Sequence, residues 1–351
     1  MSTLENTLSG QPARYAGGVH PMGQDVSAWL SPNGGWGESN AGLISGHSAS
    51  LLVDTLWDLP RTTAMLNAFG PKLASAPIRT LVNTHADGDH WFGNEMVGAG
   101  KIIATRAAAR NMKRHGPAQM KYLETVSRMF RAMSYVPLPN RGDWRIAAEY
   151  FEGMTRPFDF TNIKPALPNS TFSGKLQLDV GGREVMLIEV GPAHTSGDLI
   201  VHLPDARIVF AGDILFHGTT PVLWDGSARN WIKACERILE LKAETVLPGH
   251  GPVTDLAAVD GVRKYWQFLR TAVRRHFEKG RPAAMAAAYI ATSDEFLRQP
   301  FAKWDGQERI VINVSAIYRR LMGRKRSVSV WRRLKLLREA ALLAQELMEG
   351  E

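Results

Sequence analysis

Four side chains of the types that bind metal ions stand within six positions of one another, in the segment NTHADGDHWFGN at 83–94. They are His85, Asp87, Asp89 and His90. Imidazole nitrogens and carboxylate oxygens bind divalent cations such as zinc, iron and manganese. A single aspartate would be typical of a polar turn, whereas four such residues in one loop favour a metal site.

Three further groups of the same kind follow short apolar runs. His194 comes after MLIEVGPA, Asp213 after IVFAG and His250 after VLPG, and each is expected in a loop that directly follows a strand. Because neighbouring strands deliver such loops to one edge of a sheet, we expect all seven side chains to meet in one cleft. The adjacent Gly212 and Gly249 fit tight turns there.

Seven groups are too many for one tetrahedral ion, so the simplest interpretation is a pair of divalent cations. No thiolate joins them, since Cys235, the only cysteine, lies on an apolar helical face. Two cations would lower the pKa of a bound water from about 16 to about 7, which provides a hydroxide nucleophile. Hydrolysis of an ester, thioester, lactone or amide fits this chemistry, with Asp89 orienting the nucleophile.

The elements that must position these groups are short strands and helices in alternation. Apolar runs bounded by Gly, Pro, Asn or Asp predict strands. They lie at 41–45, 50–54, 78–83, 101–105, 183–190, 198–203, 207–211 and 244–248. Helical patterns at 59–69 and 227–242 lie between them, and the mixture predicts an α/β or α+β layer fold.

Residues 106–170 interrupt this alternation and predict an inserted cap. Helices are expected at 107–115 and 118–133, followed by a Pro-rich and aromatic stretch at 137–168. Insertions beside a catalytic edge commonly form its lid, so we expect the cap to select the substrate. Its aromatic residues favour a bulky or apolar substrate.

After Pro252 the chain reads as almost wholly helical. Asp255 is the expected N-cap of a helix that runs to Lys279, and a last amphipathic helix is expected at 329–349. We therefore expect a catalytic domain at 1–270 and a helical C-terminal extension at 271–351.

The net charge of +8, from 42 Lys and Arg against 34 Asp and Glu, is a local feature of this extension. No acidic residue lies between 319 and 338, and without the basic residues of that segment the chain is nearly neutral. The terminal helix could bind anionic lipid, nucleic acid or a second subunit, so a homodimer is one of the alternatives. We favour a helix docked on its own domain, and we expect no nucleic-acid partner. The basic residues are Arg319, Arg320, Arg324, Lys325, Arg326, Arg332, Arg333, Lys335 and Arg338.

Composition excludes several classes of protein. A hydrophobic content of 44% in 351 residues argues against disorder, and one cysteine cannot form an intrachain disulfide. No run of about 18 apolar residues predicts a transmembrane segment, and the start of the chain lacks the pattern of a signal peptide. We expect a cytoplasmic protein with a small-molecule substrate.

In its motifs the chain resembles the metallo-β-lactamase-fold superfamily, whose pattern is HxHxDH followed by a His, an Asp and a final His. Residues 26–251 carry the resemblance, and LLVDT with Asp54 matches an early strand of that family. The resemblance implies a four-layer αββα sandwich with the metals at one edge. The matching segments are HADGDH at 85–90, GPAHTSGD with His194, FAGD with Asp213 and LPGHG with His250.

The family pattern also implies a role for each ligand. The first cation falls to His85, Asp87 and His194, the second to Asp89, His90 and His250, and Asp213 bridges them. Asp87 departs from the pattern, which has histidine there. A carboxylate favours iron or manganese, although zinc is the metal we expect. Flavodiiron relatives carry an acidic residue at that position, but this chain lacks their flavin domain.

The leading hypothesis is thus a binuclear metal-dependent hydrolase of small organic substrates. His217, Trp91 and Trp224 follow ligand motifs closely and are expected to touch the substrate. The alternatives are a diiron oxidoreductase or dioxygenase, a phosphodiesterase or nuclease, and a binding module without turnover.

Overall fold

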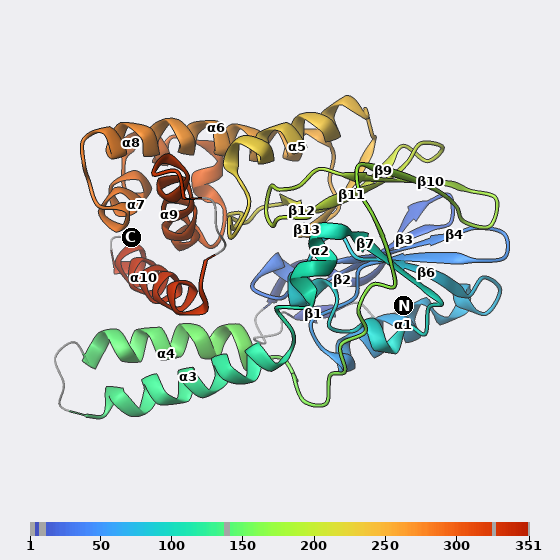
Figure 1. The fold of residues 1–351 in the computed structure, drawn as a ribbon, viewed down its shortest axis with the longest axis horizontal. Coiled ribbons are helices and arrows are strands. Elements are labelled where there is room, and N and C mark those ends of the chain that lie inside the picture. The colour runs from blue at the N-terminus through green and yellow to red at the C-terminus, as the bar shows by residue number, and fades with distance from the viewer. Residues whose placement is uncertain (1–3, 7–11, 137–140, 325–327, 350–351) are drawn as a thin grey trace.

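Two β-sheets packed face to face form the centre of the molecule in this computed structural model, which describes residues 4–6, 12–136, 141–324 and 328–349 (Figure 1). The first sheet contains β1 (Leu4–Asn6), β2 (Pro12–Gly23), β3 (Val26–Leu30), β4 (Ala41–Ser45), β5 (Ser50–Val53), β6 (Ile78–Val82), β7 (Lys101–Thr105) and β8 (Ser170–Phe172), in that spatial order. The second runs in the order β13 (Thr245–His250), β12 (Ile208–Phe216), β11 (Leu199–Leu203), β10 (Glu184–Glu189) and β9 (Lys175–Asp179).

Helices cover the outer face of each sheet. Met65 and Phe69 of α1 (Leu59–Leu73) pack on Leu43, Leu52 and Leu81 of the first sheet. The second sheet is covered by α5 (Ala228–Glu240) and α6 (Leu256–Glu278). A separate apolar layer fills the space between the sheets. The predicted αββα sandwich is therefore confirmed.

The predicted strands all form, with one informative difference. β12 continues to Phe216 and all nine of its residues are buried, so Asp213 lies within a strand rather than after one. His250 is likewise the last residue of β13. The expectation that both lie in loops was wrong, because the β12–β13 register shifts at Gly212, whose φ of 50° lets the strand resume.

Strands β1, β2, β3, β8 and β9 were not predicted. β2 is rich in glycine and contains Pro21, a composition with low β propensity. It nevertheless pairs with β3 near the edge of the first sheet, where its backbone finds partners.

The cap consists of α2 (Arg106–Met112), α3 (Ala118–Ser134) and α4 (Arg141–Thr155). The first two helices confirm the prediction, whereas α4 was missed within the stretch expected at 137–168. Its signal was present, since Trp144, Ala147, Ala148 and Phe151 recur at helical spacing. Residues 137–140 of that stretch lie outside the described residues.

The C-terminal extension adds α7 (Ala283–Ala291), α8 (Asp294–Leu297), α9 (Ile310–Leu321) and α10 (Val330–Glu349). Asp255 caps α6, accepting a hydrogen bond of 2.8 Å from Ala257 N, as predicted. The boundary expected at 270/271 falls inside α6, and the division into domains stays a prediction. Among the described residues, no helix combines the length and apolar character needed to cross a membrane.

The terminal helix docks on its own chain, which confirms the favoured interpretation. α10 lies against α4 and α9, with Leu334 and Leu337 buried, and Arg338 pairs with Asp143 of α4 at 2.6 Å. Lys325 and Arg326 of the basic segment lie outside the described residues. The cap and the extension therefore form one wall beside the sandwich (Figure 1).

The contact between the sheets generates a prediction at Gly42 of β4. A Cβ there would lie 2.0 Å from Cε1 of the buried Phe210 in β12. Replacing Gly42 by alanine should lower the free energy of unfolding by about 1–3 kcal/mol, because the packed ring cannot yield cheaply. Urea unfolding measures this. Gly153→Ala in α4 is the control: its Cβ meets nothing within 4 Å, and it should stabilise by about 0.5–1 kcal/mol. Equal effects of the two changes would contradict the packing argument.

Candidate metal centre and pocket

All seven predicted side chains meet at one edge of the two sheets. His85, Asp87, Asp89 and His90 come from the loop after β6, which ends in a short 3-10 turn at Gly88–His90. His194 follows β10, while the other two come from β12 and β13. Both sheets thus contribute to a single cluster.

Asp213 occupies the centre of this cluster. Its carboxylate oxygens lie 3.1 to 3.7 Å from the Nε2 atoms of all four histidines. The remaining groups divide into two sets around it, in each of which the ligand atoms lie within 4.8 Å of one another. One set is His85, Asp87 and His194, and the other is Asp89, His90 and His250.

Hydrogen bonds from outside the cluster orient three of the imidazoles. Nδ1 of His90 lies 3.0 Å from Oδ2 of Asp54, Nδ1 of His85 lies 2.9 Å from Oγ1 of Thr84, and Nδ1 of His194 lies 2.6 Å from the carbonyl of Val222. Since Asp54 and the Val222 carbonyl can only accept, Nδ1 carries the proton in His90 and His194. In the neutral form, which binds metal, the Nε2 lone pair of each would then face the centre.

Asp54 also holds the loop that carries the cluster. It accepts hydrogen bonds of 2.7 Å from both the backbone N–H and the hydroxyl of Thr84. Its φ of 62° lies in the left-handed region, which aspartate tolerates better than most residues. In the sequence Asp54 stands out only as a match to the family pattern, and its contact with His90 depends on the fold.

The charges of the cluster favour ionised carboxylates. Burial would raise the pKa of Asp213, but the imidazoles of His250, His90 and His85 hold it well below its usual range. The pKa of Asp87 is lowered in the same way by His194, again against the effect of burial. Burial lowers the pKa of His85, and the neighbouring His90 lowers it further.

Several buried polar atoms in the cluster suit a cation. Nε2 of His85, Nε2 of His90 and Oδ1 of Asp213 have no hydrogen-bond partner among the described residues. Buried polar atoms are normally paired, and unpaired ones that converge from several elements are typical of metal ligands. The donor set, four imidazoles and three carboxylates, fits divalent metal ions.

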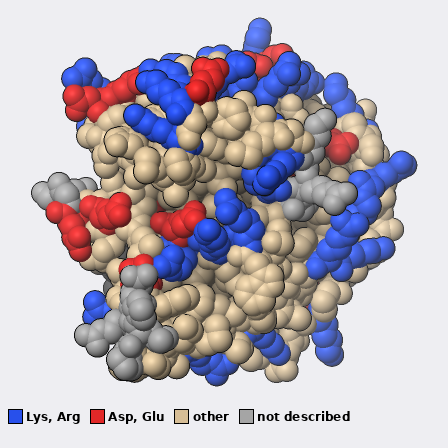
Figure 2. Space-filling model, turned by 60° about the vertical axis from the view of Figure 1, so that its left-hand side comes forward, with Lys and Arg blue, Asp and Glu red and all other residues tan. Residues whose placement is uncertain are grey.

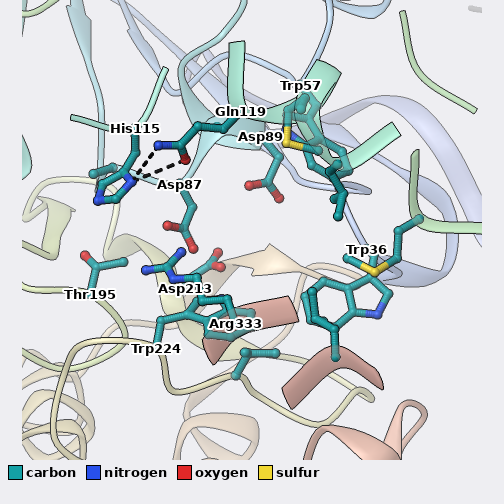
Figure 3. A pocket seen from close by; sticks show the side chains of 18 of the residues that line it. Trp36, Trp57, Asp87, Asp89, His115, Gln119, Thr195, Asp213, Trp224 and Arg333 are labelled. Carbon is teal, nitrogen blue, oxygen red and sulfur yellow. Dashed lines mark hydrogen bonds between the residues drawn. The ribbon is translucent and has the colours of Figure 1, made fainter. Parts of the chain in front are cut away.

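A mainly apolar pocket of about 220 Å³ opens above the cluster. Asp87, Asp89 and Asp213 project into it, with Trp36, Trp57 and Trp224 around them (Figure 3). The cap contributes Met120 and Leu123, and the terminal helix contributes Val330, Leu334 and Leu337. The extension is therefore part of the pocket wall, which its sequence alone did not indicate.

The three residues expected to touch substrate lie in different places. Trp224 lines the pocket. Trp91 is fully buried beneath the cluster and donates a 3.0 Å hydrogen bond to the carbonyl of Ala86. His217 is not among the lining residues, and its Nδ1 lies 3.2 Å from the carbonyl of Pro252.

Two pocket residues were not anticipated. Arg333 of α10 pairs with Asp225 at 2.8 Å and stacks on Trp224, with 5.0 Å between its Cζ and the ring centroid. His115 hydrogen-bonds Gln119 at the pocket wall (Figure 3). Neither stands near a ligand motif, so only tertiary packing brings them to the site.

A family model described as the metallo-beta-lactamase superfamily matches residues 34–250. The chain belongs to this superfamily. Among solved structures, the sec-alkylsulfatase Pisa1 from Pseudomonas sp. has a TM-score of 0.67 at 16% identity and covers 92% of this chain and 58% of its own. A metallo-beta-lactamase from Pontibacter korlensis has a TM-score of 0.50 at 20% identity, covering 71% of this chain and 98% of its own. These likenesses show the fold.

Curated relatives include enzymes of different names. The alpha subunit of 2,4-dinitroanisole O-demethylase from Nocardioides sp. is 24% identical over 59% of this chain and 51% of its own length. Acyl-coenzyme A thioesterase MBLAC2 from Bos taurus is 26% identical over 60% of this chain and 72% of its own. The chain thus spans about half the length of the demethylase subunit. The expectation of a metallo-β-lactamase-fold protein is confirmed.

The hydrogen bond between Asp54 and His90 yields a prediction. Asp54→Asn keeps the shape and the tolerated backbone conformation but replaces an acceptor-only carboxylate by an amide. Metal affinity should fall by about 10–100-fold, the usual effect of changing the group behind a ligand. Competition with a chelator, read by elemental analysis, measures it. Asp294→Asn is the control, since that side chain is 86% exposed in α8. Equal metal retention in both variants would mean that Asp54 does not tune the ligand.

Proposed function

We propose that the protein is a binuclear metal-dependent hydrolase that cleaves an ester, thioester or lactone bond in a substrate with an apolar group. The observation that supports this most strongly is the position of the seven-residue cluster at the base of an apolar pocket. The cluster suits hydrolytic chemistry, and the pocket walls suit a hydrocarbon or aromatic group.

His85, Asp87 and His194 would hold one cation, Asp89, His90 and His250 the other, and Asp213 would contact both. We propose zinc at both positions, with iron or manganese as the alternative at the Asp87 position. When bound, the two cations would polarise the scissile carbonyl and lower the pKa of a water.

The chain's own side chains would supply orientation and exclusion of bulk water. Asp89, 14% exposed and in the pocket lining, would accept a hydrogen bond from a water in the pocket. The guanidinium of Arg333 would donate to a polar or anionic group of the substrate, since its buried Nε has no partner among the described residues. Apolar side chains of the pocket wall would exclude water from the apolar group of the substrate. They are Trp36, Trp57, Trp224, Leu123 of α3, and Leu334 and Leu337 of α10.

Named relatives favour a thioester among the possible bonds. The thioesterase named above acts on acyl-coenzyme A, and hydroxyacylglutathione hydrolase from Rhizobium meliloti is 34% identical over 20% of this chain and 27% of its own length. The apolar pocket lining argues against a nuclease, because a polyanion needs a basic track. Asp87 is the one feature that favours diiron redox chemistry.

Removal of central ligands should abolish turnover. In His90→Ala and Asp213→Ala, hydrolysis of acyl thioesters and aryl esters should fall by more than about 100-fold, because even changes behind a ligand cost 10–100-fold. Stopped assays of product release with metal-supplemented enzyme measure this. His47→Ala, on an exposed turn between β4 and β5, should keep the parent rate. If both ligand variants hydrolyse at that rate, the proposed chemistry is wrong.

The pocket wall should set the size of the apolar group. Leu123 of α3 lines the pocket, and tryptophan there would occupy part of it. We expect Leu123→Trp to lower kcat/KM for long-chain acyl esters by about tenfold or more, with less than about twofold change for acetyl esters. Thr125→Trp, on the exposed side of the same helix, controls for the added bulk. A uniform loss for all chain lengths would place the apolar group elsewhere.

A further inference from the structure

A second cavity lies among the helices of the C-terminal extension and shares no lining residue with the pocket above the metal-ligand cluster. Its volume is about 620 Å³. Arg281, Arg319, Arg324 and Arg332 line it, and among the described residues no Asp or Glu does so. The proposed hydrolase mechanism uses none of these four arginines. We call it the arginine cavity.

Hydroxyl groups complete its polar lining. Ser315, Tyr318 and Ser329 line the cavity, and Ser315 Oγ accepts a 3.1 Å hydrogen bond from Nη2 of Arg332. Tyr318 is only 4% exposed, and its hydroxyl has no hydrogen-bond partner in the part of the chain that the structure describes. A buried hydroxyl is normally paired, so an acceptor in the cavity would satisfy it.

Three arginines of the cavity lie near enough to one another for their positive charges to interact. Burial lowers the pKa of Arg319, Asp225 raises it, and Arg320, Arg332 and Arg324 lower it further. Asp225 also pairs with Arg333 at 2.8 Å. Figure 2, in which the left-hand side of Figure 1 comes forward, shows Lys and Arg spread over this face, with Asp and Glu between some of them. A bound anion would relieve this repulsion.

Two helix N-termini add to the same field. Pro282 and Ala283 begin the nine-residue α7, and Ser329 directly precedes the twenty-residue α10; all three line the cavity. The N-terminus of a helix carries partial positive charge that favours a phosphate. At α10 the Ser329 hydroxyl accepts a 3.3 Å hydrogen bond from the backbone N–H of Arg332.

We propose that the arginine cavity binds a phosphate-bearing small molecule with at least two negative charges. One guanidinium group can donate two parallel hydrogen bonds to two phosphate oxygens. The Tyr318 hydroxyl would donate to another oxygen. The volume is that of a site for a small ligand, whereas nucleic acid or a bilayer would need an extended surface. The proposal is independent of the metal cluster and of the bond that the enzyme cleaves.

Titration calorimetry of the full-length protein with ADP and with inorganic phosphate, at constant ionic strength, tests it. The double variant Arg324→Gln/Arg332→Gln should bind ADP about tenfold more weakly or worse, as expected for lost charge-assisted contacts. Arg274→Gln/Arg298→Gln removes the same charge from side chains that are 70% and 80% exposed, and should bind like the parent. Protein stripped of metal with a chelator should also keep full ADP binding, which excludes chelation at the metal cluster as its source.

Tyr318→Phe separates ligand binding from a structural role. It should weaken ADP binding by about threefold or more, yet leave the melting temperature without ADP unchanged or higher, because it removes an unpaired buried hydroxyl. Absence of ADP and phosphate binding at millimolar concentration would overturn the proposal. Equal affinities in the two double variants would also overturn it. So would a clear preference for phosphatidylserine vesicles or a DNA oligonucleotide over ADP, lost in Arg324→Gln/Arg332→Gln.

Discussion

The buried carboxylate of Asp213 among four imidazoles is the interaction on which the site depends. An ionised carboxylate inside a protein is costly unless charges and hydrogen-bond donors surround it. Asp213 is 5% exposed, and every histidine of the cluster approaches it. The architecture therefore has to bring loops from both sheets to one carboxylate.

The backbone near Asp213 is shaped to allow this. Gly212 takes a positive φ, and a Cβ on Gly249 of β13 would lie 1.9 Å from Oδ1 of Asp213. The parallel β12–β13 pair can thus approach closely enough to place Asp213 and His250 side by side. Behind this pair, Asp54 and Thr84 fix the loop that brings the other ligands.

The cap and the C-terminal extension build walls of the pocket above the metal-ligand cluster. Cap helix α3 and terminal helix α10 face each other above the cluster, and α10 is held by Arg333 on Asp225 and Arg338 on Asp143. Because the same helix begins at the arginine cavity, the extension carries residues of both cavities. The position of the extension therefore shapes both cavities as well as contributing to stability.

The sequence by itself determined the seven groups of metal-ligand type, a mixed α/β layer fold and most strands, because ligand chemistry and apolar periodicity are local properties that can be read from neighbouring residues. The αββα arrangement followed from the resemblance of its motifs to the family. The sequence did not reveal the glycine-rich β2, which forms because its backbone pairs with β1 and β3. It also did not reveal α4, whose apolar residues at helical spacing lie within a stretch rich in proline and aromatic residues. Only the tertiary structure decided that Asp213 lies inside a strand, that Asp54 orients His90, and that Arg333 reaches the pocket. These are contacts between segments far apart in the chain, and their geometry depends on packing rather than on residue type.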